Sequence, residues 1–125
     1  MYPKPNRLKK KRDIEIVFEN GRFCGGAICT AKIWKVDPQK FPKRGYSVDE
    51  LKFAVVVGKK VSTSAVKRNR LKRQMREVVR LLLKEGKLRV GFYVVLMAKP
   101  QMFGKEYGEI EKDMMMVLKK VKILK

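Results

Sequence analysis

The stretch KKVSTSAVKRNRLKRQMREVVRLLLK, residues 59–84, decides the fold of this chain. At about 100° per residue, its apolar side chains fall on one narrow stripe, which is the pattern of a helix that packs against a core. The members of this stripe are Leu71, Met75, Val78 and Leu82. Any of Ser62, Thr63 and Ser64 can cap the start of the helix, because a hydroxyl accepts a free amide proton of the first turn. The stretch therefore predicts one amphipathic helix.

The other side of this helix is almost entirely positive. Like charges three or four residues apart, such as Arg73 with Arg76, each cost roughly a few tenths of a kcal/mol. Glu77 is the only acid between residues 59 and 84. Most charged helix faces are simply solvated, but such faces usually mix both signs. We therefore predict that a polyanion supplies the missing charge. The basic and polar residues of this face and its flanks are Arg68, Asn69, Arg70, Lys72, Arg73, Arg76, Arg80 and Lys84.

The composition of the whole chain supports this expectation. Its 125 residues and 45% hydrophobic content predict one folded domain, residues 1–125. The 32 Lys and Arg residues outnumber the 12 Asp and Glu residues, which gives a net charge of +20. Because this charge repels itself in the compact state, we expect an anionic partner. Nucleic acid is the first candidate, and an anionic membrane surface is the second.

Other classes of protein lack support in the sequence. No apolar segment has the length of a signal peptide core or a transmembrane helix, so we expect a cytoplasmic protein. Cys24 and Cys29 are too few for a disulfide framework, and we expect two small, partly buried thiols. The chain has no histidine, no paired carboxylates in an apolar setting and no Gly-rich phosphate loop. We therefore predict a binding subunit with no catalytic residue and no metal or cofactor of its own. The remaining acids are interpreted as charge partners for nearby cations: Glu15, Glu19, Glu77 and Asp113.

The first half of the chain predicts a tail, a helix and two strands. Residues 1–12 are basic and contain two prolines, so we expect a mobile arm ahead of a globular part at residues 13–122. A short helix follows up to Asn20, with Ile14, Val17 and Phe18 on one side. Residues 22–36 predict a short strand and a longer one. Residues 37–49 predict a loop, the least constrained part of the domain.

The second half predicts two strands and a final helix around the central one. Residues 51–57 alternate as a strand, and residues 92–98 form a nearly continuous apolar strand of the kind found inside a covered sheet. Residues 106–121 carry a helical apolar stripe. The predicted fold is an α/β (α+β) two-layer sandwich, with a small mixed sheet of about four strands and three helices.

Four blocks of this sequence resemble one known family. The run AVKRNRLKRQMREVVR, residues 65–80, is similar to the RNR signature of the bacterial ribonuclease P protein component. The blocks NRLKKKRDIEIVFENGR (6–22), KFAVVVGKKV (52–61) and GFYVVLMAKP (91–100) resemble the family in the same order. A basic amphipathic helix is a weak signal by itself, whereas four ordered blocks are a strong one. The resemblance implies the ribosomal protein S5 domain 2-like fold with a left-handed crossover.

The resemblance also implies a function and a set of residues. In ribonuclease P an RNA subunit with Mg²⁺ carries the active site, and the protein binds that RNA and the 5′ leader of precursor tRNA. Neither a membrane, nor DNA, nor a protein oligomer is implied. The residues that match the RNA-binding helix are Arg68, Asn69, Arg70, Lys72, Arg73 and Arg76, and Arg80 extends the same face. Further RNA contacts are expected at Lys59, Lys60 and Arg12, and the leader cleft at Phe18, Ile14 and Trp34. Leu8 is expected to dock on the domain.

Two other readings of the sequence remain. A ribosomal protein or general RNA-binding or chaperone module would share the charge, but it would not restore cleavage by a ribonuclease P RNA. A membrane-surface or DNA-compacting protein would prefer anionic lipid or duplex DNA. The order of residues in AVKRNRLKRQMRE argues against both, because general electrostatic attraction requires no such order.

Overall fold

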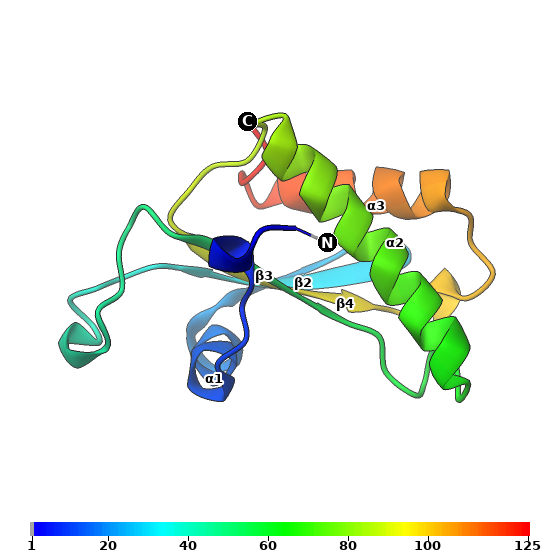
Figure 1. The fold of residues 1–125 in the computed structure, drawn as a ribbon, viewed down its shortest axis with the longest axis horizontal. Helices are drawn as coiled ribbons and strands as arrows, with labels where there is room; N and C mark the ends of the chain where they lie inside the picture. Colours follow the sequence, from blue (N-terminus) through cyan, green and yellow to red (C-terminus); the bar gives the residue numbers. More distant parts are fainter. Residues whose placement is uncertain (1) are drawn as a thin grey trace.

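The computed structural model describes residues 2–125, which form a mixed sheet of four strands with helices on both faces (Figure 1). The strands are β1 (Arg22–Gly25), β2 (Cys29–Lys35), β3 (Leu51–Val56) and β4 (Phe92–Ala98), in the spatial order β1-β2-β4-β3. The helices are α1 (Lys11–Asn20), α2 (Ala65–Lys84) and α3 (Tyr107–Lys120). The predicted α/β class, the mixed sheet and the three helices are confirmed.

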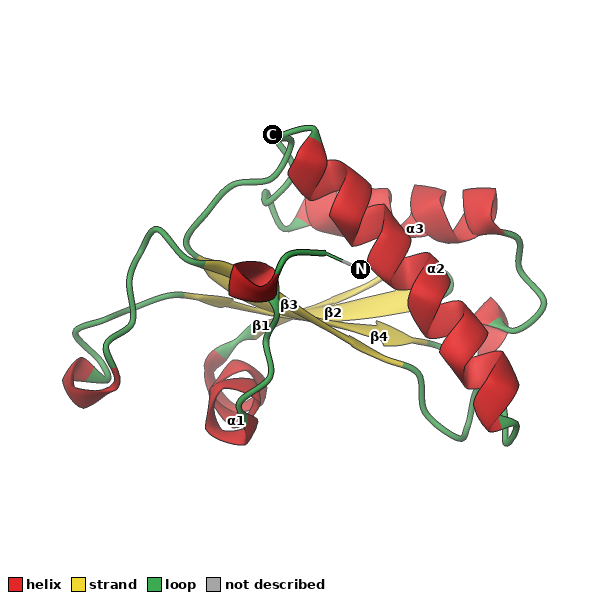
Figure 2. Cartoon of the chain, in the orientation of Figure 1, coloured by secondary structure: helices red, strands yellow, loops and turns green. Residues whose placement is uncertain are grey.

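The sheet separates two hydrophobic clusters. Strand β4 pairs antiparallel with β2 and parallel with β3, so it is covered on both edges as well as both faces. Val94 and Leu96 point toward α2 and α3 in the main core, whereas Tyr93 and Val95 point toward α1. This arrangement explains why residues 92–98 are nearly all apolar. It also puts α1 on the opposite face of the sheet from α2 and α3 (Figure 2).

Helix α2 begins later than the quoted stretch, at Ala65. The hydroxyl of Ser64 caps it by accepting a hydrogen bond from the amide of Lys67, 3.3 Å away. Residues 59–63 instead form a turn, in which the amide of Val61 donates to the carbonyl of Gly58 at 3.1 Å. The predicted apolar stripe of α2 is confirmed, because all four of its members are buried, and Val79 is buried with them.

The N-terminal segment is docked, so the expectation of a mobile arm over residues 1–12 is wrong for the residues that the structure describes; Met1 lies outside them. The hydroxyl of Tyr2 donates to the carbonyl of Phe53 at 2.7 Å, and the amide of Leu8 donates to the same carbonyl at 2.8 Å. The side chain of Asn6 donates to the carbonyl of Leu51 at 2.8 Å. Strand β3 is an edge strand with backbone groups that need partners, and this segment supplies them. Leu8 is buried, as the resemblance implied.

Asp113 is also different from its predicted role as a charge partner for nearby cations. Its side chain is 8% exposed, and its two oxygens accept hydrogen bonds from the amides of Ala27 and Ile28, both at 3.0 Å. The carboxylate therefore ties the turn between β1 and β2 to α3. Both cysteines are free, Cys24 half-buried and Cys29 buried. Burial raises the pKa of Cys29 to about 12, which keeps this thiol neutral.

Candidate nucleic-acid interface

The outward face of α2 carries charges that the protein leaves without partners. The buried stripe of α2 packs in the main core, so the cations on the opposite side of the helix face away from the sheet. Asn69, Arg70 and Arg73 are exposed, and Lys72 and Arg76 are half-buried. Within residues 2–125, no hydrogen bond or ion pair joins the side chains of these five to another group. We call these five residues the free face of α2.

Two other residues of the predicted RNA-binding set have partners within the chain. One guanidinium nitrogen of Arg68 donates to the carbonyl of Ser62 at 3.0 Å, which holds the turn ahead of the helix. Arg80 forms a forked ion pair with Glu77, and its Nε lies 3.1 Å from each carboxylate oxygen. Hydrogen bonding to Arg80 lowers the pKa of Glu77. Glu77 therefore neutralises one cation of the helix, in agreement with its predicted role as a charge partner. An Arg68→Ala change would loosen the turn as well as remove a charge.

The remaining predicted cations lie in two separate places. Lys59 and Lys60 are exposed in the turn that leads into α2, so they extend the positive surface beyond the first turn of that helix. Arg12 lies on α1, on the opposite face of the sheet (Figure 2). There it pairs with Glu15 at 3.8 Å and Glu19 at 3.4 Å, and all three side chains are exposed to water. The structure therefore does not bring Arg12 together with α2.

The predicted leader cleft is only partly open. Phe18 is 43% exposed, and with Ile14 it lines a shallow hollow of about 370 Å³ beside Lys9 and Lys11. Glu15 and Glu19 line the same hollow. Phe18 is exposed there and can stack on a base, whereas Ile14 is half-buried and packs against the cluster under α1. Ile14 can add only apolar contact, since it has no ring.

Trp34, the third predicted cleft residue, is only 4% exposed. The loop at residues 37–49 covers it with two aromatic rings. The ring centroids of Phe41 and Tyr46 lie 5.9 Å and 5.2 Å from that of Trp34, and Tyr93 adds a third edge contact at 5.5 Å. Trp34 therefore belongs to the core between the sheet and α1, and it does not share a surface with Phe18.

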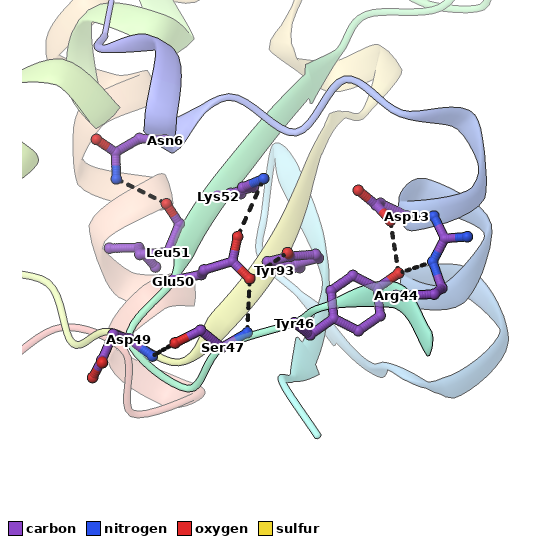
Figure 3. Close-up of polar contacts among 10 residues, drawn as sticks. All are labelled: Asn6, Asp13, Arg44, Tyr46, Ser47, Asp49, Glu50, Leu51, Lys52 and Tyr93. Atoms are coloured by element: carbon purple, nitrogen blue, oxygen red, sulfur yellow. Dashed lines mark hydrogen bonds and ion pairs between the residues drawn. The ribbon is translucent and has the colours of Figure 1, made fainter. Parts of the chain in front are cut away.

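A buried acid fixes the loop in this position (Figure 3). One carboxylate oxygen of Asp13, near the start of α1, accepts hydrogen bonds from the guanidinium of Arg44 at 2.9 Å and from the hydroxyl of Tyr46 at 2.7 Å. At the end of the loop, the hydroxyl of Tyr93 donates to the carboxylate of Glu50 at 3.0 Å. Residues 37–49 therefore form a loop that aromatic packing and these polar contacts attach to the domain.

Sequence reasoning missed part of the sheet surface beside α1. Lys32 pairs with Val95 of the cluster under α1, so its cross-strand neighbour Phe23 lies on the same face. Val56 pairs with Met97, which packs against that cluster. Phe23 is 64% exposed, and Val56 is exposed too. The alternation of residues 51–57 already indicated that Val56 faces away from the main core, but the four residues of β1 are too few to show a pattern.

We predict that Asp13→Ala will release the loop at residues 37–49 from α1. Arg44 and Tyr46 would lose their common acceptor, and water would reach Trp34, the only tryptophan of the chain. The fluorescence of Trp34 should shift to longer wavelength and become more sensitive to acrylamide. Asp49→Ala removes an exposed acid from the same loop and should leave both readings unchanged. Equal quenching of Asp13→Ala and the wild type would show that aromatic packing alone holds the loop.

The fold and the free face together define a small, basic α/β protein with a long helix that presents unpaired cations. Within residues 2–125, no helix is long and apolar enough to cross a membrane. The sequence profile described as Ribonuclease P matches residues 2–122. The chain therefore belongs to the ribonuclease P protein family.

Individual relatives agree with this assignment. The ribonuclease P protein component of Synechococcus sp. is 31% identical over 124 residues, which cover 99% of this chain and 87% of the relative. That of Pseudanabaena sp. is 32% identical and is covered to 97%. Among solved structures, a mutant RNase P protein of Staphylococcus aureus has a TM-score of 0.80 at 20% identity, covering 97% of this chain and 92% of that one. The RNase P protein of Thermotoga maritima has a TM-score of 0.73 at 22% identity, covering 93% and 97%. These structures share the fold.

Proposed function

We propose that this chain is the RNA-binding protein subunit of ribonuclease P. In this role it binds the catalytic RNA and the 5′ leader of precursor tRNA, and it assists the cleavage that leaves the mature 5′ end. The observation that carries the proposal is the free face of α2, where four cations of one helix have no partner within residues 2–125. RNA phosphates would supply the negative charge that these four cations lack within the protein.

The residues of the free face suit this work. Arg70, Arg73 and Arg76 can each offer a planar fork of donors to two phosphate oxygens, and a guanidinium also stacks on a base. Lys72 can add a point charge, and Asn69 can both donate and accept a hydrogen bond. Lys59 and Lys60 would extend the contact toward the preceding turn.

The leader would bind on the other face of the sheet. Phe18 can stack on an unpaired base, with Lys9 and Lys11 beside it for the flanking phosphates. Lys32, Phe23 and Val56 would continue this surface across the uncovered part of the sheet. One protein would then hold two RNA segments on opposite faces and reduce the repulsion between them.

In this proposal Mg²⁺ and the cleavage step belong to the RNA subunit. Mg²⁺ prefers oxygen ligands with room for several waters, and it is usually held by carboxylates or phosphates. The two buried carboxylates within residues 2–125 do not fit such a role. Asp13 is occupied by Arg44 and Tyr46, and Asp113 by two backbone amides. The protein would contribute binding and orientation, and we place the complex in the cytoplasm, where two free thiols remain reduced.

Reconstitution tests the proposal. The protein is mixed with a bacterial ribonuclease P RNA at a low Mg²⁺ concentration, at which that RNA alone is nearly inactive, and cleavage of precursor tRNA is followed. Restored cleavage at the mature 5′ end supports the proposal. Tight RNA binding without cleavage would support a general RNA-binding module instead. Arg73→Ala should lower the rescue at limiting protein, whereas Lys112→Ala, on the exposed side of α3, removes the same charge and should not.

A further inference from the structure

One exposed aromatic residue has no part in the surfaces described above. Phe103 follows the short 3₁₀ turn at Pro100–Met102, and its side chain is 48% exposed. Its backbone is well anchored, because Met102 beside it is fully buried and the amide of Phe103 donates to the carbonyl of Pro100 at 3.2 Å. The amide of Lys105 donates to the carbonyl of Met102 at 3.0 Å and closes the next turn. The backbone of Phe103 is therefore fixed, while its ring stays half-exposed.

Cations from two segments surround this ring. Phe103 lines a hollow of about 470 Å³, and the other lining residues come from the start of α2 and the turn that precedes α3. The ammonium of Lys67 lies 5.3 Å from the ring centroid, and Arg70 and Lys105 line the same hollow. Glu106, the N-cap residue of α3, also lines it and adds one carboxylate beside these cations. The hollow thus combines one accessible aromatic ring with three cations.

The position of the hollow connects it to the free face. Arg70 belongs to both, and Lys67 precedes it by one turn of α2. An RNA segment that lies along the free face would reach Phe103 without leaving the helix. Single-stranded RNA suits such a place, because its bases stack on aromatic rings while cations follow its phosphates. A base-paired helix would not, since its bases are already stacked.

We propose that Phe103 is a stacking platform for one unpaired nucleobase of the RNA that binds α2. Lys67, Arg70 and Lys105 hold the phosphates on either side of that nucleotide. The ammonium of Lys67 leaves the ring when the base arrives and moves to a phosphate. This inference rests on the proposed function, because it assumes that RNA lies on the free face.

Equilibrium binding of the full-length protein to a bacterial ribonuclease P RNA tests the platform. Phe103→Ala should weaken binding by about 5- to 150-fold, the loss reported for one stacked base. Phe103→Leu keeps an apolar side chain without an aromatic face and should lose nearly as much. Phe103→Trp should bind as well as the wild type, and its new fluorescence should be quenched by RNA. Lys67→Ala should flatten the dependence of log K on log salt, whereas Phe103→Ala should leave that slope unchanged.

Two outcomes would overturn the platform, and one control measurement accompanies them. Wild-type affinity of both Phe103→Ala and Phe103→Leu, with weaker binding by Arg73→Ala, would overturn the platform and leave the proposed function in place. Thermal unfolding of each variant separates lost contact from lost fold, because the half-exposed ring of Phe103 contributes little to the core. Failure of the wild-type protein to bind this RNA would overturn the proposed function and the platform together.

Discussion

Met75→Ala should lower the free energy of unfolding by about 2 to 5 kcal/mol, the range for truncating a large buried side chain. Met75 is fully buried in the middle of α2, where it packs in the main core between the helix and the sheet. The loss combines the removed apolar contact with a cavity that rigid neighbours fill only in part. Since a small domain has about 5 to 15 kcal/mol in total, this single change would remove a large share of the stability of the protein.

Urea denaturation followed by circular dichroism measures this effect. Arg73→Ala is the matched control, since it lies in the same helix but points to solvent, and arginine and alanine are both good helix formers. Its free energy of unfolding should stay within about 0.5 kcal/mol of the wild type. Equal losses in the two variants would mean that the buried and outward faces of α2 have been assigned wrongly.

The triple variant Lys72→Ala/Arg73→Ala/Arg76→Ala should lose more RNA affinity than any single substitution on α2. Each lost phosphate contact lowers the slope of log K against log salt by about 0.7 to 0.9, so three contacts correspond to a change of about 2 to 3. Stability should hold or rise, because the helix loses like-charge repulsion between neighbouring turns. Arg68 is left out of this variant, because its side chain also donates to the carbonyl of Ser62. Its removal would change both RNA binding and the stability of the turn before α2.

A second triple variant controls for the change in net charge. Lys112→Ala/Lys119→Ala/Lys120→Ala removes three exposed cations from α3. If general attraction between a basic protein and RNA were sufficient, both triple variants would lose the same slope and affinity. A much smaller loss in the α3 variant would locate the contact on α2. The salt series should span conditions in which the wild type changes affinity measurably.

The elements of the fold could be read from the sequence, because each depends on a local period. The stripe through Leu71 and Met75 and the apolar run of β4 report which side of an element is covered. These local patterns do not indicate which other element packs against the covered side. The contacts of Tyr2 with Phe53 and of Asp13 with Tyr46 join residues that are 51 and 33 positions apart. No local pattern encodes such pairs, so the arm and the loop were predicted as unconstrained.

In the candidate site too, the sequence indicated the features that depend on a local period and missed those that depend on distant contacts. The sequence located a row of cations on α2, since the helical period determines which residues point outward. Whether each cation is free depends on its neighbours. Glu77 precedes Arg80 by three residues, a spacing that permits an ion pair and was visible in the sequence. The bond from Arg68 to a backbone carbonyl was not visible, because it depends on the path of the turn before the helix. The burial of Trp34 likewise depends on how a distant loop folds back.

The place of β4 in the sheet has a consequence for synthesis of the chain. It is the last strand made, residues 92–98, yet it lies between β2 and β3 and pairs with both. While the ribosome extends the chain, β1 and β2 can form a hairpin and the helices can form locally, but β3 has only the N-terminal segment to pair with and no neighbouring strand. The apolar faces of β3 and α2 must wait for most of the protein to emerge. We expect the nascent chain to depend on chaperones until β4 has left the ribosome, and the sheet to close in a single cooperative step once residues 92–98 are free.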